Sequence, residues 1–140
     1  MNDPLSHLPH GPEFRFLEKI TAIEPGRSGA GEYIVHGDEP FLRGHFPGEP
    51  IFPGVLLIEA AAQLAGCVAQ SDPKVAPLRD LKLTAVRAAK ITGAARPGQT
   101  IRLTARVIAR MGNLVQASAT ASVDGVTVLQ TELTLAGATE

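Results

Sequence analysis

One acid stands out as the residue best suited to chemistry. Glu59 is the only charged side chain between Pro50 and Ser71, and its neighbours on both sides are aliphatic or alanine. A carboxyl group in apolar surroundings costs free energy unless it is used or paired, and it keeps a proton there more readily than in water. Glu59 is therefore a candidate general acid. The alternative is that its side chain reaches the domain edge or pairs with an arginine.

A histidine could supply the matching base. His45 lies in the loop 41–50, whose glycines and prolines restrict the backbone and hold the imidazole in place. A neutral imidazole accepts a proton near pH 7, so His45 and Glu59 together form a candidate acid–base pair. The alternative is a surface histidine without a role. The histidines at positions 7, 10 and 36 show no ligand spacing with Cys67 or the acids, so we expect no metal site.

A helix and an ordered loop must position these two residues. Leu, Ile and Ala dominate residues 53–70, which predicts one long helix that is apolar almost all round and ends at Ser71. The prolines and glycines of residues 40–54 predict an irregular loop before it. Helical spacing places Val55, Ala62, Gln63 and Gly66 on the face of Glu59, and the small residues leave room for a long ligand. Gln63 either orients the carboxyl group or satisfies another buried polar group.

Strand-forming residues and marked turns surround this helix. They predict a short hairpin before it, with a turn at 25–31, and a four-strand meander after it: residues 14–24, 32–35, 78–91, 100–111, 114–123 and 127–135. We therefore expect an α+β fold in which an antiparallel sheet wraps around one central helix. The 140 residues, 44% hydrophobic, predict a single domain over residues 1–140, with residues 1–12 as an N-terminal segment.

Charge and cysteine content limit the possible partners and location. The formal net charge of −1 gives no argument for nucleic acid or an anionic membrane. The basic residues are nevertheless concentrated, because residues 79–110 hold eight of them and a single acid, Asp80. The lone Cys67 and the N-terminus, which lacks a secretory signal pattern, predict a cytoplasmic protein. The apolar window 51–69 is interrupted by charged, polar and proline residues, so we expect no membrane span.

The combination of these motifs resembles a known family. Residues 44–60 have the sequence GHFPGEPIFPGVLLIEA, which resembles the signature of the (3R)-hydroxyacyl-acyl carrier protein dehydratases of FabZ type, with the hot-dog fold. The resemblance extends to Leu8-Pro9-His10, to Phe14, Glu18 and Lys19, and to the hairpin at residues 121–125. It therefore covers most of the chain. The related dehydratase-isomerases carry aspartate at the position of Glu59, so the resemblance favours an enzyme that does not move the double bond.

The resemblance implies a reaction and a role for each candidate residue. A 3-hydroxyacyl thioester loses water when His45 removes the C2 proton and Glu59 protonates the departing hydroxyl. Charge that develops on the thioester oxygen would be bound by the first free amides of the helix, at Gly54 and Val55. No cofactor is expected, since the substrate is carried on the phosphopantetheine of acyl carrier protein. In the family, each site combines the histidine of one subunit with the glutamate of the other, and the dimers often assemble as trimers of dimers.

The basic segment gains a candidate use from the resemblance. Acyl carrier protein is acidic, so Lys82, Arg87 and Lys90 are candidate docking residues; the alternative is that they form a solvated strand face. Residues 91–99 depart from the family pattern and the chain has no tryptophan. The acyl chain length, the pathway, and the choice between a substrate on acyl carrier protein and one on CoA therefore stay open. Two other functions remain: a hot-dog acyl thioesterase, which would release free thiol, and a non-catalytic acyl-binding or scaffold subunit.

Overall fold

The long helix α1 spans Gly54–Gln70 in a computed structural model that describes residues 3–139. It begins directly after Pro53, whose fixed φ and missing N–H suit a helix start. It ends at Ser71, whose hydroxyl donates a hydrogen bond to the carbonyl of Val68 at 2.7 Å. Most of the helix is buried, as expected for a helix that is apolar almost all round. The predicted helix over residues 53–70 is thus confirmed to within one residue.

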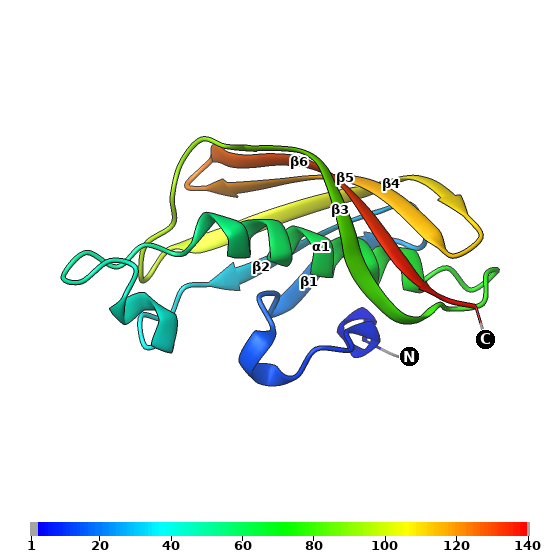
Figure 1. The fold of residues 1–140 in the computed structure, drawn as a ribbon, viewed down its shortest axis with the longest axis horizontal. Helices are drawn as coiled ribbons and strands as arrows, with labels where there is room; N and C mark the ends of the chain where they lie inside the picture. Colours follow the sequence, from blue (N-terminus) through cyan, green and yellow to red (C-terminus); the bar gives the residue numbers. More distant parts are fainter. Residues whose placement is uncertain (1–2, 140) are drawn as a thin grey trace.

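Six strands form one antiparallel sheet around this helix (Figure 1). Their order across the sheet is β1-β2-β4-β5-β6-β3, so β3 lies at one edge and β1 at the other. The expected antiparallel sheet around one helix is confirmed. The strands are β1 (Lys19–Glu24), β2 (Ser28–Ile34), β3 (Arg79–Ile91), β4 (Thr100–Met111), β5 (Leu114–Val123) and β6 (Val126–Ala138).

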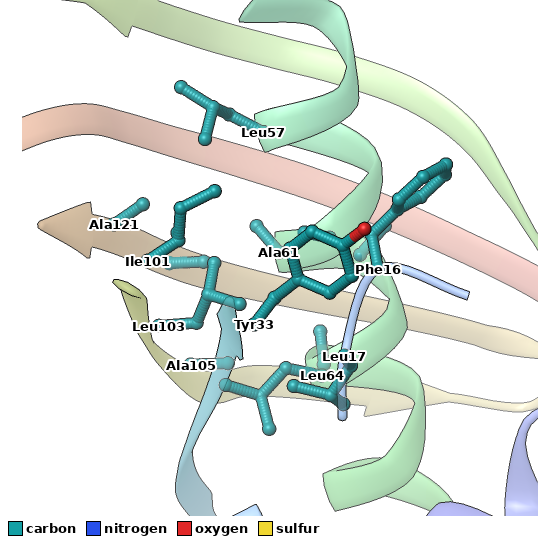
Figure 2. Packing of buried hydrophobic residues seen from close by; sticks show 14 of the residues in the cluster. Phe16, Leu17, Tyr33, Leu57, Ala61, Leu64, Ile101, Leu103, Ala105 and Ala121 are labelled. Carbon is teal, nitrogen blue, oxygen red and sulfur yellow. The ribbon is translucent and has the colours of Figure 1, made fainter. Parts of the chain in front are cut away.

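The core lies between α1 and the inner face of the sheet. Along β4, Ile101, Leu103 and Ala105 are buried, whereas the residues between them are exposed, as strand alternation requires. Figure 2 shows Leu57 and Leu64 of α1 packed with these strand residues. Alanines on the inner face of β5 let the helix lie close to the sheet. This packing fixes how α1 presents its remaining face, the one that carries Glu59.

The first hairpin differs from its prediction. The predicted turn at residues 25–31 is wrong in extent, because β2 already begins at Ser28 and includes Gly29 and Gly31. These glycines permit close approach and do not form a turn. A Cβ on Gly29 would lie 2.7 Å from Cγ2 of Val68, and one on Gly31 would lie 2.8 Å from the carbonyl oxygen of Lys19. Glycine in a strand often marks such a contact.

Replacing Gly31 with alanine should therefore destabilise the fold. The new methyl group would meet a backbone oxygen at 2.8 Å, so the hairpin must shift, and we expect a loss of about 1–3 kcal/mol in the free energy of unfolding. Urea denaturation measures this difference. Gly44→Ala is the matched control, since a Cβ there meets nothing within 4 Å. Equal stability of the two variants would contradict the close-approach explanation.

Two irregular segments complete the fold. The N-terminal segment contains short 3-10 turns at Pro4–His7 and Pro12–Phe14, and the first of them lies against α1 (Figure 1). Phe14 is therefore not in the first strand, contrary to prediction, because the chain turns there before β1. The loop between β2 and α1 contains a 3-10 turn at Pro40–Arg43 and lies at the end of the molecule where α1 begins. Within residues 3–139, no helix has the length and apolar character needed to cross a membrane.

Candidate active site

A cavity of about 450 Å³ lies against one face of α1. Four parts of the chain line it: this helix face, the N-terminal segment, the first half of β3 and Leu135 of β6. Its apolar wall includes Leu8, Leu81, Leu83 and Leu135, and two of its polar residues, His10 and Gln63, contact the carboxyl group of Glu59. A largely apolar cavity with a few polar groups is typical of a ligand site. The helix residues that line it are Glu59, Ala62, Gln63, Gly66 and Gln70.

Glu59 is held by two side chains within this cavity. Its side chain is 19% exposed, and its Oε2 lies 3.1 Å from Nε2 of Gln63 and 3.1 Å from Nε2 of His10. The Gln63 amide donates the first of these hydrogen bonds. The expectation that Glu59 simply reaches the domain edge or pairs with an arginine is not what the geometry shows. The contact with His10 was not predicted from the sequence.

Gln63 has a second set of contacts. It is 2% exposed; its Oε1 accepts from the amide of Phe16 at 2.9 Å, and its Nε2 donates to the carbonyl of Phe14 at 2.8 Å. Both roles considered for Gln63 are thus present in the geometry, since one amide contacts the carboxyl group and also satisfies buried backbone groups. It ties the segment before β1 to the helix and so closes one side of the cavity.

His45 is held in a defined orientation by its own loop. Its Nδ1 lies 2.8 Å from the carbonyl oxygen of Ile51 and its ring stacks on Phe46, with centroids 4.1 Å apart. A carbonyl oxygen can only accept, so Nδ1 carries the hydrogen, and in the neutral ring Nε2 has the free lone pair. The amide of Ile51 donates back to the carbonyl of His45 at 2.8 Å. Nε2 is therefore the atom that could act as a base.

The start of α1 presents free amides beside this loop. Pro53 accepts from Leu56 and Leu57, whereas the amides of Gly54 and Val55 have no hydrogen-bond partner in the described part of the chain. The side chain of Val55 is 70% exposed, and a Cβ on Gly54 would come within 2.9 Å of Cδ1 of Ile91. The absence of a side chain at Gly54 therefore lets Ile91 pack closely against the start of α1, where free amides of the kind that bind anions remain.

His45 does not line the cavity that contains Glu59. Over residues 3–139, His45 bonds to Ile51 and Glu59 bonds to His10 and Gln63, and no hydrogen bond joins the two candidates. Each is nevertheless preorganised, one by its loop and the other by its helix face.

Comparisons with known proteins place this chain in a family. The model of the FabA-like domain family matches residues 8–132. The chain belongs to the FabA-like family. Its relatives include proteins named 3-hydroxyacyl-[acyl-carrier-protein] dehydratase FabZ: one from Anaeromyxobacter sp., 35% identical over 89% of this chain and 81% of that protein, and one from Geotalea uraniireducens, 35% identical over 95% and 92%. The resemblance to FabZ-type dehydratases is confirmed.

Solved structures confirm the hot-dog fold of this FabA-like chain. The dehydratase heterocomplex ApeI:P from Xenorhabdus doucetiae has a TM-score of 0.83 and 20% identity, over 100% of this chain and 94% of that one. Zebra fish thioesterase superfamily member 2 has a TM-score of 0.68 and 17% identity, over 93% and 88%. At these identities the likeness shows the fold alone, which both dehydratases and thioesterases share.

The three candidate docking residues of the FabA-like chain lie along β3 but not on one surface. Lys82 lines the cavity that contains Glu59, whereas Lys90 lines a separate hollow on the outer face of the sheet. Arg87 lies 3.5 Å from Glu132. Part of the basic excess is also used internally, since Arg102 contacts Glu32 at 2.9 Å and Arg110 donates to the carbonyls of Ala69, at the end of α1, and Ala76, which follows it. Of the three, Lys82 is nearest to the candidate site.

A carboxylate that the sequence did not single out fixes the start of the His45 loop. Glu39 accepts from the Tyr33 hydroxyl at 2.6 Å and from the amides of His36 and Gly37 at 3.0 and 2.7 Å. Burial by itself would raise the pKa of Glu39, but these hydrogen bonds outweigh it and lower the pKa. Burial and the same contact raise the pKa of Tyr33. The adjacent proline at position 40 was the only sequence signal of an ordered turn here.

Glu39→Gln should lower the free energy of unfolding, and the loss should be larger at neutral pH than at acidic pH. Hydrogen bonds to a charged group are stronger than neutral ones, so we expect a loss of about 1.5–3 kcal/mol at pH 7. Because the folded-state pKa of Glu39 is lowered, its stabilising effect is present above the unfolded value of about 4.3 and is lost as pH falls through the folded value. Urea denaturation at pH 7, 4 and 3 should show that the difference in the free energy of unfolding between the wild type and Glu39→Gln becomes smaller as the pH falls. Asp38→Asn is the control. A difference that does not change with pH would contradict the stabilising role of the Glu39 carboxylate.

Proposed function

We propose that this chain dehydrates (3R)-3-hydroxyacyl thioesters, carried on acyl carrier protein, to trans-2-enoyl thioesters in fatty acid biosynthesis or a related pathway. The observation that supports it most is the carboxyl group of Glu59, held by Gln63 and lining a largely apolar cavity in a chain of the FabA-like family. FabZ dehydratases at 35% identity over most of the chain lend further support.

In the proposed mechanism His45 is the base and Glu59 the acid. Nε2 of His45 takes the proton from C2, the C3–O bond breaks, and Glu59 protonates the departing hydroxyl, so that water leaves and C2 and C3 become doubly bonded. The amides of Gly54 and Val55 bind the charge that develops on the thioester oxygen. The two side chains suffice for this chemistry, and we expect no cofactor besides the phosphopantetheine of the carrier. The lone Cys67 is buried, which raises its pKa to about 12 and keeps the thiol protonated. A chain with a single free cysteine is compatible with the cytoplasm, where we place the reaction.

The active form is proposed to be a homodimer with shared sites. The edge strand β3 pairs with β6 alone within residues 3–139, so its other side offers unpaired backbone groups to a second copy. Val86 and Ile91 on β3 are 44% and 46% exposed, which fits an edge that becomes covered. Pairing of two β3 edges would join the sheets and bring His45 of one subunit toward the cavity of the other. Such dimers could assemble further as trimers of dimers.

A product assay decides between the candidate functions. Purified wild-type protein is incubated with 3-hydroxyacyl carrier protein and, separately, with the matching CoA ester, over a series of chain lengths. The proposal predicts the absorbance of an enoyl thioester without release of free thiol. Free thiol without enoyl formation would instead identify a thioesterase. Neither product, together with binding of the acyl carrier, would favour a non-catalytic acyl-binding subunit.

Docking of the carrier is expected to depend on salt. If Lys82, the candidate docking residue nearest to the cavity, attracts the acidic carrier, KM for carrier-bound substrate should rise with ionic strength far more than KM for a small thioester. Steady-state kinetics at about 0.05 and 0.5 M salt measure this. Lys82→Gln should reduce the salt dependence, whereas Arg102→Gln, whose guanidinium already contacts Glu32, should not. Equal salt dependence for both substrates would leave the basic residues as a solvated face.

A further inference from the structure

A second histidine, which the proposed mechanism does not use, contacts the carboxyl group of Glu59. His10 lies in the N-terminal segment, and its Nε2 is 3.1 Å from Oε2 of Glu59. The side chain is 26% exposed, yet Nδ1 is buried without a hydrogen-bond partner among residues 3–139. His10 thus lies in direct contact with the candidate acid.

The two contacts to Glu59 fall on the same oxygen. Oε2 accepts from the Gln63 amide at 3.1 Å and also faces His10, whereas Oε1 has no hydrogen bond in the described part of the chain. An oxygen that accepts two N–H donors is favoured as the unprotonated oxygen of a carboxyl group. The proton of the acid form then belongs on Oε1. The two oxygens of Glu59 would therefore have different roles.

Both donors are anchored to the same short segment. Gln63 donates to the carbonyl of Phe14, and the His10 ring stacks on Phe14, with centroids 6.1 Å apart and an interplanar angle of 21°. The carbonyl of His10 accepts from Nε of Arg15 at 2.9 Å. Packing of the segment against α1 therefore positions His10 and Gln63 together. A carboxyl group fixed in this way is preorganised, since it rarely adopts an unproductive orientation.

We propose that His10 is a positioning residue that donates from Nε2 to Oε2 of Glu59 and, with Gln63, presents Oε1 as the oxygen that carries the proton to the departing hydroxyl. This inference rests on the proposed dehydratase function. It assigns the tautomer of His10: Nε2 carries the hydrogen, and the buried Nδ1 carries the lone pair. His10 takes no proton from the substrate, so its removal should slow the reaction and leave substrate binding intact.

Two substitutions separate the donor from the packing. His10→Phe keeps an aromatic ring to stack on Phe14 but removes the donor, whereas His10→Gln restores an N–H near the position of Nε2. We expect His10→Phe to lower kcat by about 10- to 100-fold with KM for a small 3-hydroxyacyl thioester nearly unchanged, and His10→Gln to recover most of kcat. His36→Gln is the matched control. Nε2 of His36 lies 2.8 Å from Oε2 of Glu18, and neither residue lines the cavity, so this substitution should leave kcat unchanged.

The outcomes distinguish this inference from the proposed function. The positioning role would be overturned by any of three results. The first is an unchanged kcat in His10→Phe, and the second is an effect of His10→Phe on KM alone. The third is a loss of kcat that His10→Gln does not restore although both variants have the same melting temperature. Absence of enoyl formation by the wild type would overturn the dehydratase proposal itself. Nitrogen-15 NMR of the wild-type histidines tests the contact independently of activity, since a hydrogen on Nε2 of His10 is expected and one on Nδ1 would contradict it.

Discussion

Glu59→Gln and His45→Ala should each reduce kcat for dehydration by about 10²–10⁴-fold, the range that one general acid or base contributes. Glutamine retains the size of Glu59 and its contact with Gln63 but has no proton to give to the departing hydroxyl. Alanine at position 45 removes the Nε2 lone pair that the Ile51 contact leaves free. Enoyl formation under saturating substrate measures both losses.

The control for these variants is Glu49→Gln. Glu49 lies in the same loop as His45, and its side chain is exposed, so its substitution should preserve kcat. Melting temperatures of all three variants should remain near that of the wild type, because none of the three substitutions disturbs the packed core. Retention of most activity by either Glu59→Gln or His45→Ala would refute the assigned acid–base pair.

A heterodimer of two inactive variants should regain activity. If each site combines His45 of one subunit with Glu59 of the other, a dimer of His45→Ala with Glu59→Gln contains one site with both residues intact and one with neither. We expect about half the wild-type activity per dimer, from the symmetry of a twofold interface. Co-expression with two different tags, followed by two affinity steps, isolates this species for the enoyl assay.

The homodimers of each variant, purified in the same way, provide the reference. Both should remain nearly inactive, so recovery in the mixed dimer would amount to at least an order of magnitude, given the losses expected from single substitutions. A mixed dimer as inactive as its parents would show that each chain uses its own His45 and Glu59. A chain that stays monomeric in solution would refute the shared site directly.

Much of the fold could be predicted because its signals are local. The run of helix-forming residues ending at Ser71 predicted α1, and alternating strands with marked turns predicted β3 to β6 to within a few residues. The first hairpin was harder to predict. Gly29 and Gly31 belong to a glycine-rich stretch that is typical of a turn. They nevertheless lie within β2, because Val68 and Lys19 come close to them. Contacts between residues distant in sequence decided that position.

The site divides in the same way. Glu59 and His45 were identifiable because each is a titratable residue in surroundings that make it unusual: an apolar helix and a loop rich in proline and glycine. His10 showed no comparable signal. Its contact with Glu59 depends on the N-terminal segment packing against α1, with Gln63 bonded to Phe14 and Phe16. Glu39 likewise became visible only through its hydrogen bonds with residues 33–37.

Helix propensity, strand alternation and motif spacing act over short stretches of chain, so the helix, the meander and the candidate pair His45 and Glu59 could be predicted from the amino acids alone. The folded chain was needed to see which groups surround Glu59, which nitrogen of His45 is free, and that no hydrogen bond joins the two residues within residues 3–139. Those features depend on distances between segments far apart in sequence, which only the packing of α1 against the sheet and the N-terminal segment sets.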